Sequence, residues 1–186
     1  MNRRIKKYND EYIRDISGSA KDGVIYIGDW YVFENDRKTV KKGKIGAVIT
    51  SVLSAVLFVI AGFLDAKASF TAYVFMPFIV SFLPIVYSVA DGFKLMSYGE
   101  KLTHKQYDKT VVNLKQTSLA NIILSSLALL GDAVMYAMAY GFDKIEIETP
   151  TLDIVFTLCL SAILLLNVLL YSFSKKLVCA PVKNEK

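Results

Sequence analysis

Histidine and cysteine are scarce in this chain, which has one histidine and two cysteines among 186 residues. The cysteines, Cys159 and Cys179, form no CxxC pair, and His104 stands far from both. A structural zinc site takes about four thiolate or imidazole ligands, so the sequence excludes a zinc site of this usual kind. We therefore expect no bound metal, no cofactor and no disulfide framework.

Charged residues are nearly absent from four long stretches, although they make up 21% of the chain. A helix that crosses the hydrocarbon core of a bilayer needs roughly 20 apolar residues. The four stretches reach that length at about 45–64, 70–93, 117–140 and 152–173. The sequence therefore predicts an all-α membrane protein, whose four-helix transmembrane bundle occupies residues 45–173.

Basic residues gather on one side of these spans. Five precede the first span, five lie in the 94–116 loop and four follow the last span, against Lys67 and Lys144 on the other side. Cytoplasmic flanks of spans carry such an excess of lysine and arginine. We expect a multi-pass plasma membrane protein with segment 1–44, the loop and the tail 174–186 in the cytoplasm. The net charge of +5 then indicates contact with anionic lipid headgroups rather than nucleic acid.

The cytoplasmic segment 1–44 contains two short runs of β-branched and aromatic residues, 24–27 and 30–33, around the pair Gly28-Asp29. Glycine readily takes the backbone conformation that a tight primed turn requires, so the pattern predicts a β-hairpin at 24–33. We expect it to pack on the bundle, on lipid headgroups or on a partner. Three aromatic residues favour the headgroups and form a candidate interface: Tyr26, Trp30 and Tyr31. The alternative is a small structural cap.

The second span carries two prolines, Pro77 and Pro84, on one helical face with Ser81 and Ser88. Each proline removes a backbone hydrogen bond and bends a helix. We expect a kink here. It is either a hinge that lines a cavity or a bend that merely fits the bundle.

The third span contains an acid, Asp132. An ionisable side chain inside a bilayer costs free energy, so we expect Asp132 to have a bonding partner or a function. Asn121, Ser125 and Tyr136 share its helical face. These four residues form a candidate intramembrane polar cluster. It either binds a proton or a cation, or joins helices through hydrogen bonds.

Catalysis is not expected, and no residue is a candidate for it. The single histidine lies in a loop, and Cys159 has no histidine near it in sequence. Asp91 lies at the cytoplasmic end of the second span, and Asp132 lies toward the external end of the third. They are therefore too far apart to share a proton or a water molecule as an acid pair does.

Three short motifs are found across the chain: Tyr26-Ile27-Gly28-Asp29-Trp30-Tyr31, Tyr73-Val74-Phe75-Met76-Pro77-Phe78 with Leu83-Pro84, and Leu102-Thr103 to Tyr107. In these motifs the chain resembles uncharacterised four-span integral membrane proteins of Gram-positive bacteria. The resemblance implies a plasma membrane location and carries no activity.

Two functions follow as hypotheses. The first is an accessory, scaffolding or regulatory subunit of a membrane complex, which binds a protein partner or a second copy of itself. The alternative is a small transporter or ion-coupled protein that uses Asp132.

Overall fold

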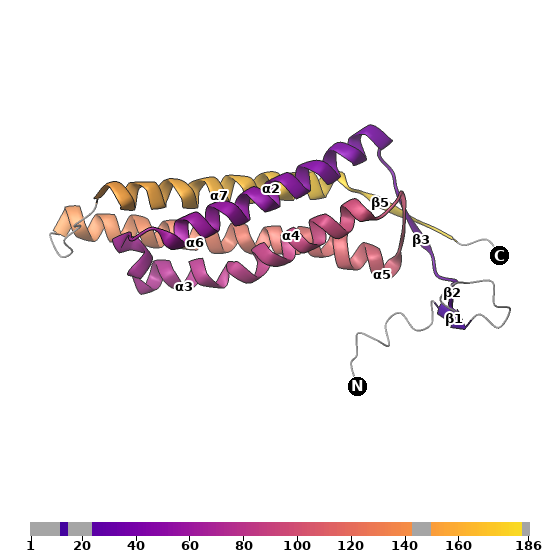
Figure 1. Ribbon diagram of the computed structural model, residues 1–186, viewed down its shortest axis with the longest axis horizontal. Helices are drawn as coiled ribbons and strands as arrows, with labels where there is room; N and C mark the ends of the chain where they lie inside the picture. Colours follow the sequence, from indigo (N-terminus) through magenta and orange to yellow (C-terminus); the bar gives the residue numbers. More distant parts are fainter. Residues whose placement is uncertain (1–11, 15–23, 143–149, 184–186) are drawn as a thin grey trace.

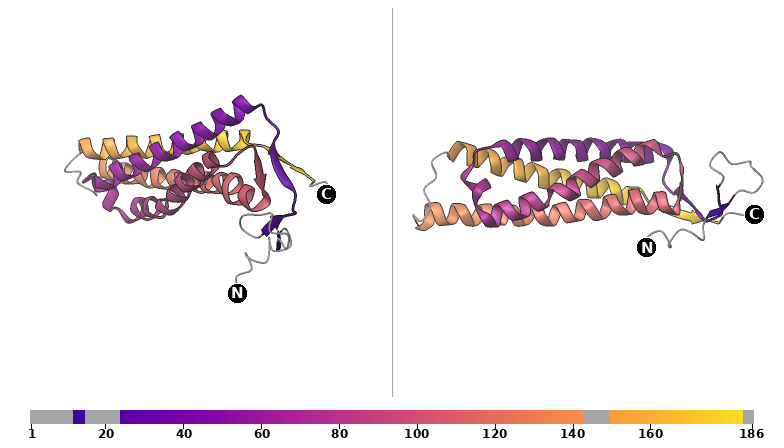
Figure 2. Two further views of the ribbon diagram at one scale, coloured as in Figure 1. Left: turned by 45° about the vertical axis from the view of Figure 1, so that its right-hand side comes forward. Right: turned by 60° about the horizontal axis from the view of Figure 1, so that its bottom comes forward.

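The computed structural model describes residues 12–14, 24–142 and 150–183. Four helical segments run side by side along the long axis, and strands gather at one end (Figure 1, Figure 2). Each segment is long and apolar enough to cross a membrane. The predicted set of four apolar helices is therefore confirmed.

The first and fourth spans are single helices, α2 (Arg37–Phe63) and α7 (Pro150–Lys176), which lie against each other. Helix α2 begins among lysines, well before its first long apolar run. The side chain of Asp36 caps it by accepting a hydrogen bond from the amide of Lys38 at 3.3 Å. An aspartate at this position satisfies one of the free amides of the first turn, which explains the early start.

The second span is broken at Ser81 into α3 (Ala72–Val80) and α4 (Phe82–Ser97). Pro77 lies inside α3, and at the break the amide of Ser81 still donates to the carbonyl of Pro77 at 3.1 Å. Pro84 lies in the first turn of α4, where a helix has unpaired amides and tolerates proline. The predicted kink is present as this interruption between the two prolines.

The third span, α6 (Asn113–Phe142), continues from α5 (His104–Tyr107) through a π-helical turn, η3 (Asp108–Val112). A capping box starts this long helical segment. The amide of Gln106 donates to Thr103 Oγ1 at 3.3 Å, and the amide of Thr103 donates to Gln106 Oε1 at 2.9 Å. Two free amides are thereby satisfied reciprocally.

A three-stranded antiparallel sheet closes one end of the bundle (Figure 1). Its middle strand is β3 (Trp30–Phe33), which pairs with β4 (Lys101–Thr103) on one side and β5 (Cys179–Val182) on the other. Tyr31 lies opposite both Leu102 and Pro181. We call this sheet, together with α5, the sheet cap, because it joins three segments that are distant in sequence.

The predicted hairpin at 24–33 is wrong. Strand β2 (Val24–Tyr26) pairs with β1 (Tyr12–Arg14), and β3 pairs elsewhere. An isolated hairpin is marginally stable in water. In the sheet cap, β3 instead gains two strand partners, and its Tyr31 and Phe33 pack against an apolar cluster that includes the buried Leu102.

Two buried apolar clusters fill the ends of the bundle. The cluster beside the sheet cap includes Val40, Leu95, Leu102, Leu114 and Leu177. The cluster at the far end includes Ala61, Val74, Phe78, Met135 and Phe156. Several buried polar residues lie along the helices between the two clusters, among them Ser54, Ser88, Asn121 and Asn167.

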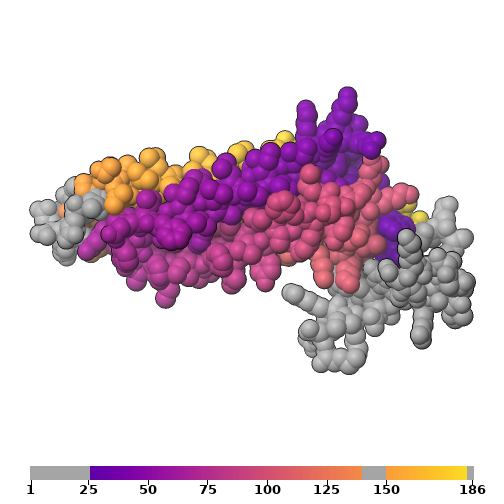
Figure 3. Space-filling model, in the orientation of Figure 1, coloured from indigo at the N-terminus to yellow at the C-terminus, as the bar shows by residue number. Residues whose placement is uncertain are grey.

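Large apolar side chains also cover the outside of the bundle. Exposed examples come from all four spans and include Phe63, Met76, Leu130, Leu158 and Leu165. In the space-filling view, α2 runs along the bundle beside the second span (Figure 3). Extended apolar surface of this kind marks contact with lipid or with another protein in the membrane.

Candidate functional site

Asp132 lies in the half of α6 that is away from the sheet cap, with 1% of its surface exposed. Its Oδ2 accepts a hydrogen bond from Thr157 Oγ1 of α7 at 2.6 Å. The same hydroxyl lies 2.9 Å from the backbone carbonyl of Asp153. A hydroxyl has one proton to donate, so these two acceptors compete for it.

Asp153 is a second buried acid at this end, and it is fully shielded from solvent. Its Oδ1 accepts a hydrogen bond at 2.9 Å from the amide of Ala68, which lies within the short helix η2 (Lys67–Phe70). Asp153 was not among the candidate residues that the sequence indicated. Its spacing of four from Thr157 is the signal that both residues share one face of α7.

The two acids leave oxygen atoms without partners. Within the described residues, Asp132 Oδ1 and Asp153 Oδ2 are buried and accept no hydrogen bond. The carboxyl groups also interact electrostatically with each other. Buried carboxylates are costly unless paired, so this acid pair is a place where a proton or a cation would be stabilised. The described residues contain no cluster of three or more metal-ligating side chains.

The other predicted cluster members are spread along α6. Asn121 and Ser125 are buried, and Tyr136 is partly buried against the far-end apolar cluster. At 1.5 Å per residue, Asn121 lies about 16 Å from Asp132 along the helix. The four residues therefore share one side of α6 without forming one compact site.

Asn167 of α7 connects this helix to α2 in the middle of the bundle. Its Nδ2 lies 3.1 Å from Ser54 Oγ on α2 and 2.8 Å from the carbonyl of Ile163. Asp132 of α6 contacts Thr157 of α7. Measured along the two helices from this contact, Asn121 and Asn167 both lie about 15 Å toward the sheet cap. A polar layer therefore crosses the bundle at this depth.

Asp91 occupies the opposite end of the bundle from Asp132. Its two oxygens accept from Lys94 Nζ at 2.9 Å and from Asn113 Nδ2 at 2.7 Å. Asn113 lies 19 residues before Asp132, or about 28 Å along the helix. The geometry gives Asp91 its own partners and keeps it away from the far acid pair.

The three predicted interface aromatics belong to the sheet cap or adjoin it. The ring of Tyr31 stacks on Tyr107 at 4.4 Å and on His104 at 5.4 Å between ring centroids. The amide of His104 donates to the hydroxyl of Tyr26 at 3.1 Å, and the ring of Trp30 lies edge-on to Tyr26. All three are partly buried. The contacts of Tyr26 and Tyr31 connect β2 and β3 to α5.

Lys44 was seen in the sequence only as a flanking charge, yet it is buried, with 9% of its surface exposed. Its Nζ donates to the carbonyls of Tyr98 at 2.8 Å and Gly99 at 3.1 Å, and lies 4.9 Å from the centroid of the Phe33 ring. A cation is favoured by the unpaired carbonyls that follow a helix. Lys44 therefore connects α2, the end of α4 and β3.

These contacts make a bundle with an acid pair at one end and the sheet cap at the other. Its helices are joined by polar contacts at several depths. Comparisons of the chain with protein-family models, with curated proteins and with solved structures find no match.

Proposed function

We propose that the protein is an accessory or scaffolding subunit of a membrane complex, and that it binds a protein partner through the sheet cap. The observation that carries this proposal is the sheet itself. Strands from the N-terminal region, the long loop and the tail pair with one another instead of remaining separate. A platform held by three segments and by Lys44 is more rigid than a loop, and rigid surfaces lose less entropy on binding.

The interior of the bundle supports the same proposal. Some of its polar side chains join neighbouring helices, as in the pairs Thr157 with Asp132, Asn167 with Ser54 and Ser88 with Thr117. Such contacts inside membranes contribute on average about 0.6 kcal/mol each. Their arrangement serves cohesion of the four helices, which leaves outer surfaces for recognition.

Charge indicates the kind of partner. The cap and the adjoining helix ends expose many basic side chains, namely Lys38, Lys41, Lys42, Lys101, Lys105 and Lys109. Arg37 is paired with Glu100 at 2.8 Å, and both are exposed. A predominantly basic surface attracts acidic protein segments and anionic headgroups. By the distribution of lysine and arginine, we place this end in the cytoplasm of a cell with the protein in its plasma membrane.

Site-specific photo-cross-linking in cells tests the proposal. A photoreactive amino acid replaces Lys105 in the cap, and in a control variant it replaces Thr151, which is exposed in the first turn of α7 at the other end. We expect one discrete protein adduct from position 105 and none from position 151. Recovery of the protein without an adduct at 105, or with the same adducts at both positions, would count against the proposal.

A second candidate function is ion coupling at the acid pair. The observation in its favour is that Asp132 Oδ1 and Asp153 Oδ2 are buried without partners. Proton uptake by proteoliposomes that contain a pH-sensitive dye is the direct measurement. Ion coupling requires proton uptake above that of empty vesicles. Asp132→Asn should abolish this uptake, and the exposed control Thr151→Val should retain it. Equal rates for the wild type and Asp132→Asn would exclude it.

A further inference from the structure

The hydroxyl of Thr157 lies within hydrogen-bond distance of two acceptors at once. Its Oγ1 is 2.6 Å from Asp132 Oδ2 on α6 and 2.9 Å from the backbone carbonyl of Asp153, one turn back on α7. Both distances are typical of O–H···O hydrogen bonds. Neither a carbonyl nor a charged carboxylate can donate. If Asp132 is charged, one of these two short contacts therefore has no hydrogen atom between its oxygens.

A proton on Asp132 supplies the missing hydrogen atom. We propose that Asp132 binds a proton at neutral pH and uses it to donate a hydrogen bond to Thr157, while Asp153 stays charged. The hydroxyl of Thr157 is then free to donate to the carbonyl of Asp153. Both contacts become hydrogen bonds in one chain, which runs from α6 to α7.

The surroundings of Asp132 favour its neutral form. Among the described residues, Thr157 is its one hydrogen-bond partner, and no basic side chain forms an ion pair with it. Asp153 acts on it electrostatically and has the same sign of charge. A buried carboxylate without a cation is costly, and such a group becomes neutral by taking up a proton.

Other titratable side chains at this end do not change that balance. Lys67 of η2 is the cation among those that the structure describes, and it is exposed, so water screens its charge. The remaining described groups are an exposed acid, two tyrosines and a cysteine: Asp65, Tyr73, Tyr136 and Cys159. None of these carries a positive charge that would stabilise a charged Asp132.

The surroundings of Asp153 favour its charged form. Its Oδ1 accepts a hydrogen bond from the amide of Ala68 at 2.9 Å, and hydrogen bonds of this kind favour a carboxylate over a neutral acid. Asp153 also lies in the first turn of α7, where the helix dipole stabilises a negative charge. Two carboxyl groups whose surroundings differ in this way take different protonation states.

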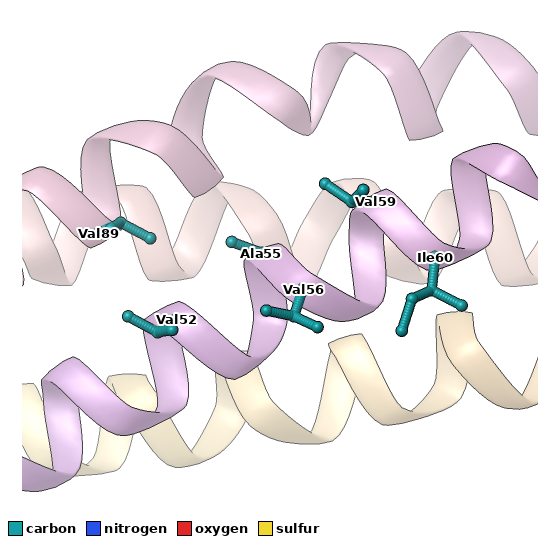
Figure 4. Close-up of a pocket in the computed structure, with 6 residues that line it drawn as sticks. All are labelled: Val52, Ala55, Val56, Val59, Ile60 and Val89. Carbon is teal, nitrogen blue, oxygen red and sulfur yellow. The ribbon is translucent and has the colours of Figure 1, made fainter.

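The apolar pocket on the outer side of the bundle gives neither acid a contact with solvent. It lies between α2 and α4, and it is lined by aliphatic side chains: Val52, Ala55, Val56, Val59, Ile60 and Val89 (Figure 4). No residue of α6 or α7 is among them. Water in this pocket would therefore not hydrate a charge on Asp132.

The acid pair fits a proton better than a metal ion. Ca²⁺ takes about six to eight oxygen ligands and Mg²⁺ about six. Within the described residues, the pair offers two buried oxygens without partners, Asp132 Oδ1 and Asp153 Oδ2. A proton needs only one oxygen that holds it and one that accepts from it, and Asp132 Oδ2 and Thr157 Oγ1 provide them. The inference rests on the acid pair of the second candidate function and names its ion.

Infrared spectroscopy of the purified protein in an ester-free detergent tests the proposal, because a protonated carboxyl group has a carbonyl stretching band that carboxylates lack. We expect this band in the wild type at pH 7. Asp132→Asn should lose it. The matched control Asp91→Asn should retain it, since Asp91 forms an ion pair with Lys94. A wild type without the band, or a band that persists in Asp132→Asn, would overturn the proposal.

Thermal melting provides a second measurement. The amide introduced by Asp132→Asn can donate to Thr157 as the protonated acid does, so this variant should melt within about 2 °C of the wild type. Asp91→Asn should melt lower, because Asp91 accepts from two donors, Lys94 and Asn113. A melting temperature that falls as far in Asp132→Asn as in Asp91→Asn would contradict the assignment.

Proton uptake by vesicles remains a separate test of ion coupling. The infrared band without uptake would support the bound proton and count against ion coupling. Uptake by a wild type that lacks the band would overturn the bound proton alone.

Discussion

Thr157 Oγ1 lies 2.6 Å from Asp132 Oδ2, so a hydroxyl of α7 contacts the buried acid of α6. The hydroxyl is one turn from Asp153, whose carboxylate accepts a hydrogen bond from a backbone amide of η2. Three parts of the far end are thereby connected through two acids and one hydroxyl. The stability of this end should depend on that hydroxyl.

Thr157→Val removes the donor and preserves the shape of the side chain. Asp132 then has no hydrogen-bond partner among the described residues for either oxygen. An unsatisfied buried group costs about 1–3 kcal/mol. We expect a lower free energy of unfolding by about 1 kcal/mol in SDS titrations of the purified protein. The exposed control Thr151→Val should change it by less than about 0.5 kcal/mol, and an equal loss in both variants would contradict the role assigned to Thr157.

Gly131→Ala tests how closely α6 and α3 approach. A Cβ at this position would lie 2.8 Å from the backbone carbonyl oxygen of Tyr73, which cannot rotate away. Overpacking of this kind costs typically about 1–3 kcal/mol. Gly62→Ala is the matched control, since its nearest neighbour would be 3.9 Å away in the ring of Phe78. We expect a lower melting temperature for Gly131→Ala alone, and unaltered melting would refute the close contact.

Lys44→Met tests the connection between α2 and the sheet cap. The variant keeps the apolar stem and removes the donor to the carbonyls of Tyr98 and Gly99. Hydrogen bonds from charged groups contribute about 1.5–3 kcal/mol. We expect faster amide hydrogen exchange in β4 and β5, with exchange in α6 unchanged. The exposed control Lys42→Met should show no difference, and protection of β4 and β5 equal to the wild type in Lys44→Met would be the contrary result.

Cys179 provides a pH-dependent test of the cap. Burial raises the pKa of its thiol to about 12. The thiolate is the reactive form, so alkylation should be slow at pH 8 and rise about tenfold per pH unit up to pH 10 without a plateau. In SDS, where the pKa of an exposed cysteine is about 8.5, the rate should level off above pH 9. The Cys159→Ala variant isolates this signal, and a plateau below pH 9 in the folded protein would show that the thiol is not buried.

The four apolar helices were predictable because each depends on a local run of residues that matches the bilayer thickness. The capping box at Thr103 and Gln106 is equally local, and the structure contains both of its hydrogen bonds. The break near Pro77 also follows from one residue type.

The partners of the strands were not predictable in the same way. The pattern around Gly28-Asp29 favours a turn, but Tyr31 lies opposite Leu102 and Pro181, which are about 70 and 150 positions away in sequence. Asp153 was likewise hidden, because its partner is the amide of Ala68, and backbone groups leave no signature in a sequence. Both failures concern contacts over long sequence separation.

We propose that the four helices cross a membrane with the sheet cap on the cytoplasmic side. The test labels single cysteines with a membrane-impermeant maleimide. One cysteine replaces Lys105 in the cap and the other replaces Thr151 at the far end, each in a background with Cys159→Ala and Cys179→Ala. In intact cells we expect labelling of Thr151→Cys alone, and labelling of Lys105→Cys after the membrane is permeabilised. Labelling of Lys105→Cys in intact cells, with Thr151→Cys protected, would contradict the account.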